Sequence, residues 1–193
     1  RISHDGTITT SAGRTGHGYS GDGGPATSAR LNKPRGFAID RSGNIFIADT
    51  ENHLIRKVDA NGTITTVAGS GIPGFSGDGG SALLANLKFP NAIDIDDLGN
   101  MYIADSDNHR IRKVDINGTI TTIAGSGIVG FSGDGGLAKY SQLDSPKDIK
   151  IDTAGRIFIA DSGNHRVRII DLNGSIATIA GSGAAGTGNG NMS

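Results

Sequence analysis

Aspartate and histidine, side chains that commonly move protons or bind metals in enzymes, recur together along this 193-residue chain. In each of three copies, spaced 56 residues apart, a His follows an Asn and stands four residues after an Asp. An enzyme domain usually has one catalytic centre, whereas these pairs occur once in every copy. We therefore predict that they hydrogen-bond buried backbone groups of their own copy. The pairs are Asp49 and His53, Asp105 and His109, and Asp161 and His165.

Basic residues follow each histidine as Arg56-Lys57, Arg112-Lys113, and Arg166 with Arg168. Nucleic-acid binders concentrate unbalanced positive charge. Here the formal net charge is −1 and each basic group is followed by an aspartate, so we predict local ion pairs on a solvated face and no nucleic-acid partner. These aspartates are Asp59, Asp115 and Asp171.

A glycine-rich connector precedes the strands of each copy. It contains the sequence Ser-Gly-Asp-Gly-Gly, which an aromatic residue directly precedes. The phosphate-loop pattern GxxxxGK[ST] is absent, and one carboxylate per loop supplies too few oxygens for calcium. We predict that the Asp caps the short helical segment that follows, and that the aromatic packs the connector onto the sheet. The residues are Asp22, Asp78 and Asp134, with Tyr19, Phe75 and Phe131.

An Asn-Gly pair near the end of each copy predicts a tight hairpin turn, because both residues tolerate positive φ. The same turns read Asn-x-Ser/Thr, which is the acceptor pattern for N-glycosylation in secreted eukaryotic proteins. The expected turns, and candidate glycosylation sites, are at Asn61, Asn117 and Asn173.

The copies differ just after a recurring proline, where the first strand of each copy begins. If the copies are arranged around an axis, their first strands line a central channel. Residues that differ between the copies at this place are suited to select a ligand or partner. The candidate binding residues are Arg35, Asn91, Lys147 and Asp148, together with the connector aromatics Tyr19, Phe75 and Phe131.

A metal site in such a channel would have only Asn91 and Asp148 as ligands from these strands. Three of the five histidines belong to the repeated pairs, and the chain has a single Glu. We therefore expect no metal and no cofactor, with a divalent cation in the channel as the alternative.

Runs of β-branched residues separated by Gly, Asn and Asp predict four strands in each copy. In the first copy the strands are expected at Gly36–Asp40, Asn44–Asp49, Leu54–Val58 and Thr63–Ala68. Four antiparallel strands repeated around an axis form a β-propeller blade, so the expected fold is an all-β propeller.

The repeat predicts complete blades at residues 14–69, 70–125 and 126–181, with a linker-like tail at 182–193. Residues 1–13 match the end of a copy, so Thr7–Ala12 is expected to be the outermost strand of a partial, preceding blade. Closed propellers have about 4 to 8 blades. We therefore expect either the remainder of a longer chain or a homo-oligomer to complete the ring.

The motif carried by Asp49, Asn52, His53 and Arg56 in each copy, with the literal Asn-His-Leu at 52–54, resembles the NHL repeat. The resemblance spans the three copies, and the connectors are similar to those of long NHL blades. It implies a propeller, commonly with six blades, of which this chain holds three and part of a fourth.

This resemblance leaves three functions open. We expect a non-catalytic, secreted or extracellular interaction module that presents loops to a protein or glycan, or a structural part of a larger assembly. The alternative is a fragment of a metal-dependent lyase or lactonase-type hydrolase, and RNA binding comes third because of the charge. No apolar run is long enough to span a membrane, and the chain contains no Cys.

Overall fold

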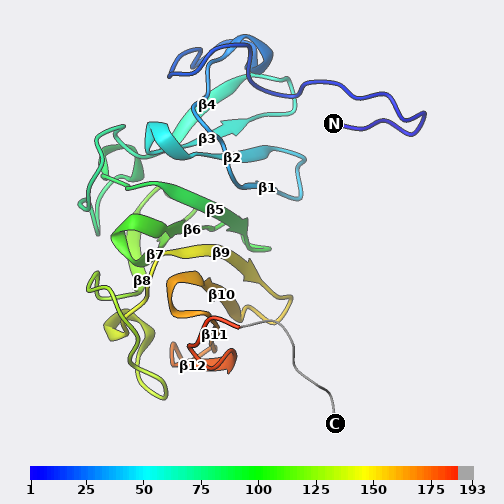
Figure 1. Cartoon of the computed structure of the whole chain (residues 1–193). Coiled ribbons are helices and arrows are strands. Elements are labelled where there is room, and N and C mark those ends of the chain that lie inside the picture. Colours follow the sequence, from blue (N-terminus) through cyan, green and yellow to red (C-terminus); the bar gives the residue numbers. More distant parts are fainter. Residues whose placement is uncertain (187–193) are drawn as a thin grey trace.

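The chain folds into three four-stranded antiparallel sheets, as predicted, in a computed structural model that describes residues 1–186 (Figure 1). Consecutive strands are neighbours within each sheet, so each sheet is a meander, and the sheets follow one another in chain order. We call them blade 1 (β1–β4), blade 2 (β5–β8) and blade 3 (β9–β12). Their strands are β1 (Phe37–Ile39), β2 (Ile45–Asp49), β3 (Leu54–Val58), β4 (Ile64–Ala68), β5 (Pro90–Ile95), β6 (Met101–Asp105), β7 (Arg110–Val114), β8 (Ile120–Ala124), β9 (Pro146–Ile151), β10 (Ile157–Asp161), β11 (Arg166–Ile170) and β12 (Ile176–Ala180).

The outer hairpin of each blade is closed by the Asp that follows the basic residues. In blade 1 the Asp59 carboxylate accepts hydrogen bonds from the backbone N–H groups of Asn61 and Thr63, both at 2.9 Å. Gly62 takes the positive φ of 80° that this turn requires. The predicted Asn-Gly turn therefore forms, but Asp59 holds the turn instead of pairing with Arg56.

Each connector lies along the outer strand of the blade that follows it in the chain. The backbone N–H of Gly23 donates to the Ile64 carbonyl at 2.8 Å, and the N–H of Ile64 donates to the Gly24 carbonyl at 3.0 Å. An uncovered edge strand is a template for unwanted pairing, so the connector protects the outer edge.

The predicted helical segments of the connectors are short 3-10 turns at Ala26–Ser28, Ala82–Leu84 and Ala138–Tyr140. Their N-cap positions are Pro25, Ser81 and Leu137, and no side chain caps them. The prediction that the connector aspartates cap these segments was therefore wrong.

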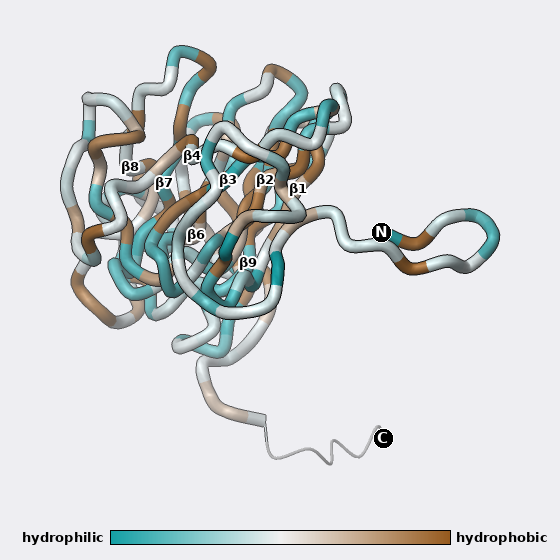
Figure 2. The backbone as a smooth tube through the Cα atoms, turned by 90° about the horizontal axis from the view of Figure 1, so that it is seen from above, coloured by the Kyte–Doolittle hydropathy of each residue, from teal (hydrophilic) through white to brown (hydrophobic). Residues whose placement is uncertain are grey.

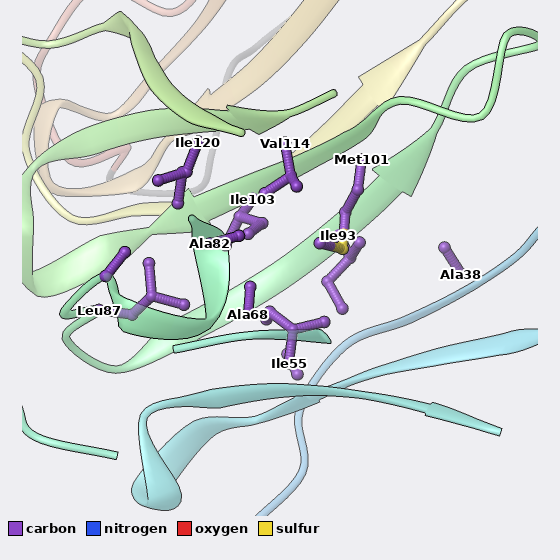
Figure 3. Close-up of a cluster of buried hydrophobic side chains, with 12 residues drawn as sticks. Ala38, Ile55, Ala68, Ala82, Leu87, Ile93, Met101, Ile103, Val114 and Ile120 are labelled. Atoms are coloured by element: carbon purple, nitrogen blue, oxygen red, sulfur yellow. The ribbon is translucent and has the colours of Figure 1, made fainter. Parts of the chain in front are cut away.

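The hydrophobic core lies between neighbouring blades, because each sheet buries its faces against the next sheet. Figure 3 shows the cluster between blades 1 and 2, in which Ile55 and Ala68 of blade 1 face Ile93 and Ile103 of blade 2. Leu87, at the end of the connector, is fully buried in the same cluster. A second cluster joins blades 2 and 3, and includes Ile111, Leu143 and Ile159. The blades therefore stabilise one another through shared cores.

The N-terminal residues form a hairpin that projects from the body of the protein (Figure 2). Ile2 and Ile8 make an isolated antiparallel bridge, with exposed fractions of 70% and 77%. The strand predicted at Thr7–Ala12 therefore does not form, and that prediction was wrong. The bridge has the register of Val58 with Ile64 in blade 1, so residues 1–9 keep the turn of an outer hairpin.

Candidate functional site

The repeated aspartate at the end of the second strand of each blade organises a buried polar cluster. Asp49 is fully buried, and its carboxylate accepts hydrogen bonds from the backbone N–H of Asn32 at 2.6 Å and the side chain of Asn52 at 2.8 Å. Asn52 also donates to the carbonyl of Gly18 in the connector, at 2.8 Å. Asp105 and Asp161 make the same contacts in blades 2 and 3. The cluster ties each connector to its own blade.

A fully buried arginine completes this cluster in each blade. In blade 2, Arg112 pairs with Asp105 at 3.3 Å and with Asp78 of the connector at 2.7 Å, and it donates to the Ser76 carbonyl at 3.0 Å. Arg56 and Arg168 repeat the arrangement in blades 1 and 3. The predicted ion pairing is present, but these arginines are buried and not on a solvated face, and their partners are the Asp of the second strand and that of the connector.

The connector aromatics lie against these arginines. The Arg110 and Arg112 guanidinium carbons lie 3.7 and 4.8 Å from the centre of the Phe75 ring, and Arg166 and Arg168 flank Phe131 at 3.7 and 4.7 Å. In blade 1 the Tyr19 ring lies 4.8 Å from the guanidinium of Arg56. Cation–π contacts thus pack the connector onto the blade, as predicted for these aromatics.

Burial controls the protonation of the carboxylates in these clusters. Desolvation raises the pKa of Asp105 to about 6, against the hydrogen bonds from Asn108 and Lys88 and the charge of Arg112, which lower it. Desolvation also raises the pKa of Asp49. At Asp22, by contrast, desolvation is outweighed by the hydrogen bonds from Thr66 and Tyr19 and by Arg56, which together lower its pKa. With a pKa of about 6, Asp105 is still mostly ionised at pH 7 and pairs with the buried Arg112.

The repeated histidines join one blade to the next. His53 adopts a left-handed conformation, with φ of 58°, and its Nδ1 accepts a hydrogen bond at 3.2 Å from the backbone N–H of Phe89 in blade 2. His109 accepts at 3.1 Å from the N–H of Ser145 in blade 3. The histidines thus bond partly buried backbone groups, but the prediction that they act within their own blade was wrong.

A hydroxyl close to each of these histidines makes a second contact with the following blade. The Thr50 hydroxyl donates to the carbonyl of Pro90 at 2.8 Å, and Ser106 donates in the same way to the carbonyl of Pro146. Sequence analysis missed both contacts, although Thr50, Ser106 and Ser162 each directly follow the repeated Asp. This recurrence was the signal that could have revealed them.

The variable residues lie on the innermost strands β5 and β9, or, in the case of Arg35, two residues before β1. Arg35 of blade 1 donates to the Asn91 side chain of blade 2 at 3.2 Å, and the Asn91 amide donates to the Phe89 carbonyl at 3.1 Å. Lys147 and Asp148 are exposed on β9 of blade 3, and Asp148 accepts from the N–H of Ile149 at 2.9 Å. The structure therefore brings Arg35 and Asn91 together and leaves Lys147 and Asp148 open to solvent.

Neither proposed channel ligand lies in a cluster of metal-binding side chains. Both polar atoms of the Asn91 amide are already hydrogen-bonded. Among residues 1–186, no group of three or more His, Cys, Asp or Glu is placed to hold a metal ion. In the same range no helix is long and apolar enough to cross a membrane.

The candidate glycosylation sites lie on exposed hairpin turns. Asn61, Asn117 and Asn173 are all exposed, and each precedes a glycine with φ near 80°: 80°, 81° and 83°. The tail at 182–193 is described only as far as residue 186, so residues 187–193 of this predicted segment lie outside the described residues.

Solved structures show the same kind of propeller. The chain is similar to a chain in the crystal structure of the nidogen/laminin complex, with a TM-score of 0.56 and 18% identity, over 80% of this chain and 52% of that one. It is also similar to a gluconolactonase from Xanthomonas campestris, with a TM-score of 0.54 and 14% identity, over 77% of this chain and 47% of that one. At these identities the likeness shows the fold alone.

Sequence comparisons define the family. Human Teneurin-1 is 28% identical over 80% of this chain, and the chloroplastic protein SUPPRESSOR OF QUENCHING 1 of Arabidopsis thaliana is 35% identical over 66% of it. The chain covers 8% and 13% of the lengths of these two relatives. The model of the Teneurin NHL domain matches residues 7–72, 73–130 and 129–189. Because these matches span nearly the whole chain, and each contains one complete four-stranded blade, the chain belongs to the Teneurin NHL domain family.

Proposed function

We propose that this chain is a non-catalytic propeller scaffold that binds a protein or glycan through the variable residues of its innermost strands. One observation carries the proposal. The repeated ionisable residues, such as Asp105 and Arg112, are bonded within a blade, whereas the charged residues that differ between copies, Arg35, Lys147 and Asp148, are exposed. Variable charged residues on a rigid framework are where recognition concentrates.

The comparisons support a protein partner in a general way. One of the similar chains comes from the crystal structure of a nidogen/laminin complex. Arg35 and Lys147 are cationic and Asp148 is anionic, so the innermost strands offer charges of both signs to a polar partner. Such charges contribute to specificity and to the rate of association.

The test uses two variants with matched changes in charge. The first, Arg35→Ser/Lys147→Ser/Asp148→Ser, removes the innermost charges. The control, Arg14→Ser/Lys139→Ser/Asp107→Ser, removes two exposed basic residues and one exposed acidic residue elsewhere. Wild type and both variants are applied to a glycan array and to a panel of purified extracellular proteins.

We expect wild type and control to bind a common partner, and the innermost-strand variant to bind it at least ~10-fold more weakly, because the loss of a few polar contacts costs more than about 1.4 kcal/mol. Equal binding by both variants, or no partner on either panel, would contradict the proposal.

We also propose a secreted or extracellular location with glycans on Asn61, Asn117 and Asn173. The exposure of all three acceptor residues supports this. Intact mass from a secreting eukaryotic host should fall on treatment with an N-glycosidase, and the triple Asn→Gln variant should show a smaller fall, because only the acceptor pattern at Asn191 is left. A wild-type mass that the glycosidase leaves unaltered would end this part of the proposal.

A further inference from the structure

Blades 2 and 3 each have a second arginine, at the first residue of the third strand. In blade 2 the guanidinium carbon of Arg110 lies 3.7 Å from the centre of the Phe75 ring. Its two terminal nitrogens donate to the carbonyls of Asn108 at 3.1 Å and Ser126 at 2.7 Å. Arg166 of blade 3 repeats these three contacts at 3.7, 3.1 and 2.8 Å. An aromatic ring and two carbonyls therefore form a guanidinium site, which the chain itself fills in both blades.

Blade 1 has the same guanidinium site, but Leu54 stands in place of the arginine. Tyr19 supplies the aromatic ring of the site. The carbonyls of Asn52 and Ser70 take the places of the two acceptors, and no donor within residues 1–186 is bonded to either of them. The groups that hold an arginine in blades 2 and 3 are thus present in blade 1 without an arginine of its own.

The space that the arginine fills in blade 2 is open in blade 1. A Cβ on Gly127 would clash with the guanidinium of Arg110. At Gly71, the matching glycine of blade 1, the atom nearest to a Cβ would be the Asn52 carbonyl oxygen, 3.9 Å away. A cavity of about 540 Å³ opens here, and the residues that carry the ring and the two carbonyls all line it. A planar group on a side chain can therefore enter the site from outside.

Charge favours a cation in this cavity. In blades 2 and 3 the buried cluster contains two arginines and two aspartates, so its formal charges balance. Among the described residues of blade 1, Arg56 is the one arginine beside Asp22 and Asp49, so this cluster is formally one positive charge short. Arg56 leaves room for a second guanidinium, because it lies 4.8 Å from its ring, as Arg112 does from the ring that it shares with Arg110.

We propose that this cavity binds the guanidinium of an arginine side chain supplied by a partner protein. The guanidinium stacks on the Tyr19 ring and donates to the carbonyls of Asn52 and Ser70. Its hydrocarbon stem packs on Leu83, which lies at the rim and is 50% exposed. A planar guanidinium reaches both carbonyls at once, whereas the ammonium of lysine is a compact point charge.

The lining of the cavity favours an arginine within a polypeptide over free arginine. None of the lining residues is basic, so the carboxylate of free arginine would have no partner there. In a polypeptide that carboxylate is replaced by an amide. The occupant is therefore an exposed arginine of a protein.

NMR titration of the isotope-labelled full chain with the peptide acetyl-Gly-Arg-Gly-amide, at constant ionic strength, tests the proposal. We expect saturable shifts of the backbone amides of Gly69, Ser70 and Gly71. The same peptide with citrulline, whose neutral urea group replaces the guanidinium, should bind at least ~10-fold more weakly, because the charge is lost. The lysine peptide should also bind more weakly, and free arginine should bind no more tightly than the arginine peptide.

Two variants place or remove an arginine in the site. Leu54→Arg supplies the guanidinium from within, as blades 2 and 3 do, and should weaken peptide binding at least ~10-fold. Leu98→Arg, at a 79% exposed position, is the matched control and should bind like the wild type. Conversely, Arg110→Leu should open a second site, seen as new shifts at Gly125 and Gly127. A gain of binding cannot result from misfolding.

The aromatic ring is tested by a separate pair of variants. Tyr19→Leu should weaken peptide binding roughly 2- to 30-fold, because it removes the cation–π contact. Tyr19→Phe, which has the ring of blades 2 and 3, should bind like the wild type.

Several outcomes would overturn the proposal. Amides at Gly69 and Gly71 that do not shift, or equal binding of the citrulline or lysine peptide, would show that the cavity does not select a guanidinium. Leu54→Arg that binds as tightly as Leu98→Arg would place the peptide elsewhere, and tighter binding of free arginine would exclude a protein as its source. The proposed function is tested separately, because the variant without the innermost charges changes no residue of this cavity and should bind the peptide like the wild type.

Discussion

Replacing Arg112 by Met tests whether the repeated Asp–Arg cluster holds each blade together. The substitution keeps an unbranched side chain of similar length but removes the guanidinium. Asp105, whose side chain is fully buried, loses its partner at 3.3 Å, and the Ser76 carbonyl loses its donor at 3.0 Å. Asp78 loses a bond of 2.7 Å, but its side chain is 39% exposed and water replaces the arginine there.

The buried carboxylate therefore dominates the expected cost. Removing one partner of a buried ion pair destabilises a protein by about 3–5 kcal/mol, because the other charge is left unpaired. We expect a decrease of this size in the free energy of unfolding, measured by urea denaturation at pH 7. Lys113→Met is the matched control: Lys113 is the next residue, is partly buried, makes no ion pair within residues 1–186, and its ammonium lies 5.4 Å from the centre of the Tyr102 ring. It should cost within about 0.5 kcal/mol.

Two further measurements separate charge from packing. In an Asp105→Asn background the cost of Arg112→Met should fall by roughly 1–3 kcal/mol, because the unpaired charge is gone. The pKa of Asp105, already raised to about 6 by burial, should rise further without Arg112. Between pH 7 and 5 the folded variant then binds more protons, relative to its unfolded chain, than the wild type does. The loss in free energy of unfolding caused by Arg112→Met should therefore become smaller as the pH falls from 7 to 5. An Arg112→Met cost below about 1 kcal/mol, or an unchanged cost with Asn at 105, would refute the reasoning.

Three other substitutions test the junctions and turns. Gly125→Ala should destabilise the protein by more than about 1 kcal/mol beyond Gly118→Ala in urea titrations: both have positive φ, 88° and 81°, but only at Gly125 does a Cβ meet the His109 carbonyl. Equal losses would mean that φ alone matters. Leu87→Ala should cost about 2–5 kcal/mol by opening the core between blades 1 and 2, whereas Leu84→Ala, at a 77% exposed position, should cost within about 0.5 kcal/mol. A Leu87 loss no larger than that of Leu84 would count against the shared core. Desolvation lowers the pKa of His53 below 6.5, so its contribution is complete above that pH and is lost as the pH falls toward the folded value. His53→Asn, which tolerates the same φ and does not titrate, should lose less stability than wild type between pH 7 and 5, and parallel curves would exclude His53 as the titrating group.

The fold could be predicted from the sequence because its signals are local and repeated. The observed strands of blade 1 begin and end within one residue of the predicted ones, since Asn-Gly turns and β-branched runs define them. The strand expected at Thr7–Ala12 does not form, because local sequence alone does not make an outer strand. Its sequence matches an outer strand, but an outer strand forms only beside its inner neighbours, and residues 1–13 supply only the turn.

The roles of the repeated polar residues were predicted less completely. Repetition correctly indicated that Asp49 bonds backbone groups, but it did not reveal the partner of His53, which lies 36 residues further along the chain in the next blade. Likewise, Asp59 is near Arg56 in sequence, whereas Asp22 is 34 residues away and makes the contact. Contacts between segments that far apart depend on how the connector folds back, which local patterns do not encode.

The connectors also matter for how such a chain emerges during synthesis. Gly79 and Gly80 leave the ribosome well before Ile120, the outer strand residue to which they bond. The residues that cover each outer edge have therefore been synthesised before the last strand of that blade. Nascent chains with bare strand edges are prone to pair with one another. In this chain the residues that bond the edge of each outer strand are synthesised before that strand, so they can cover its edge as soon as the strand pairs.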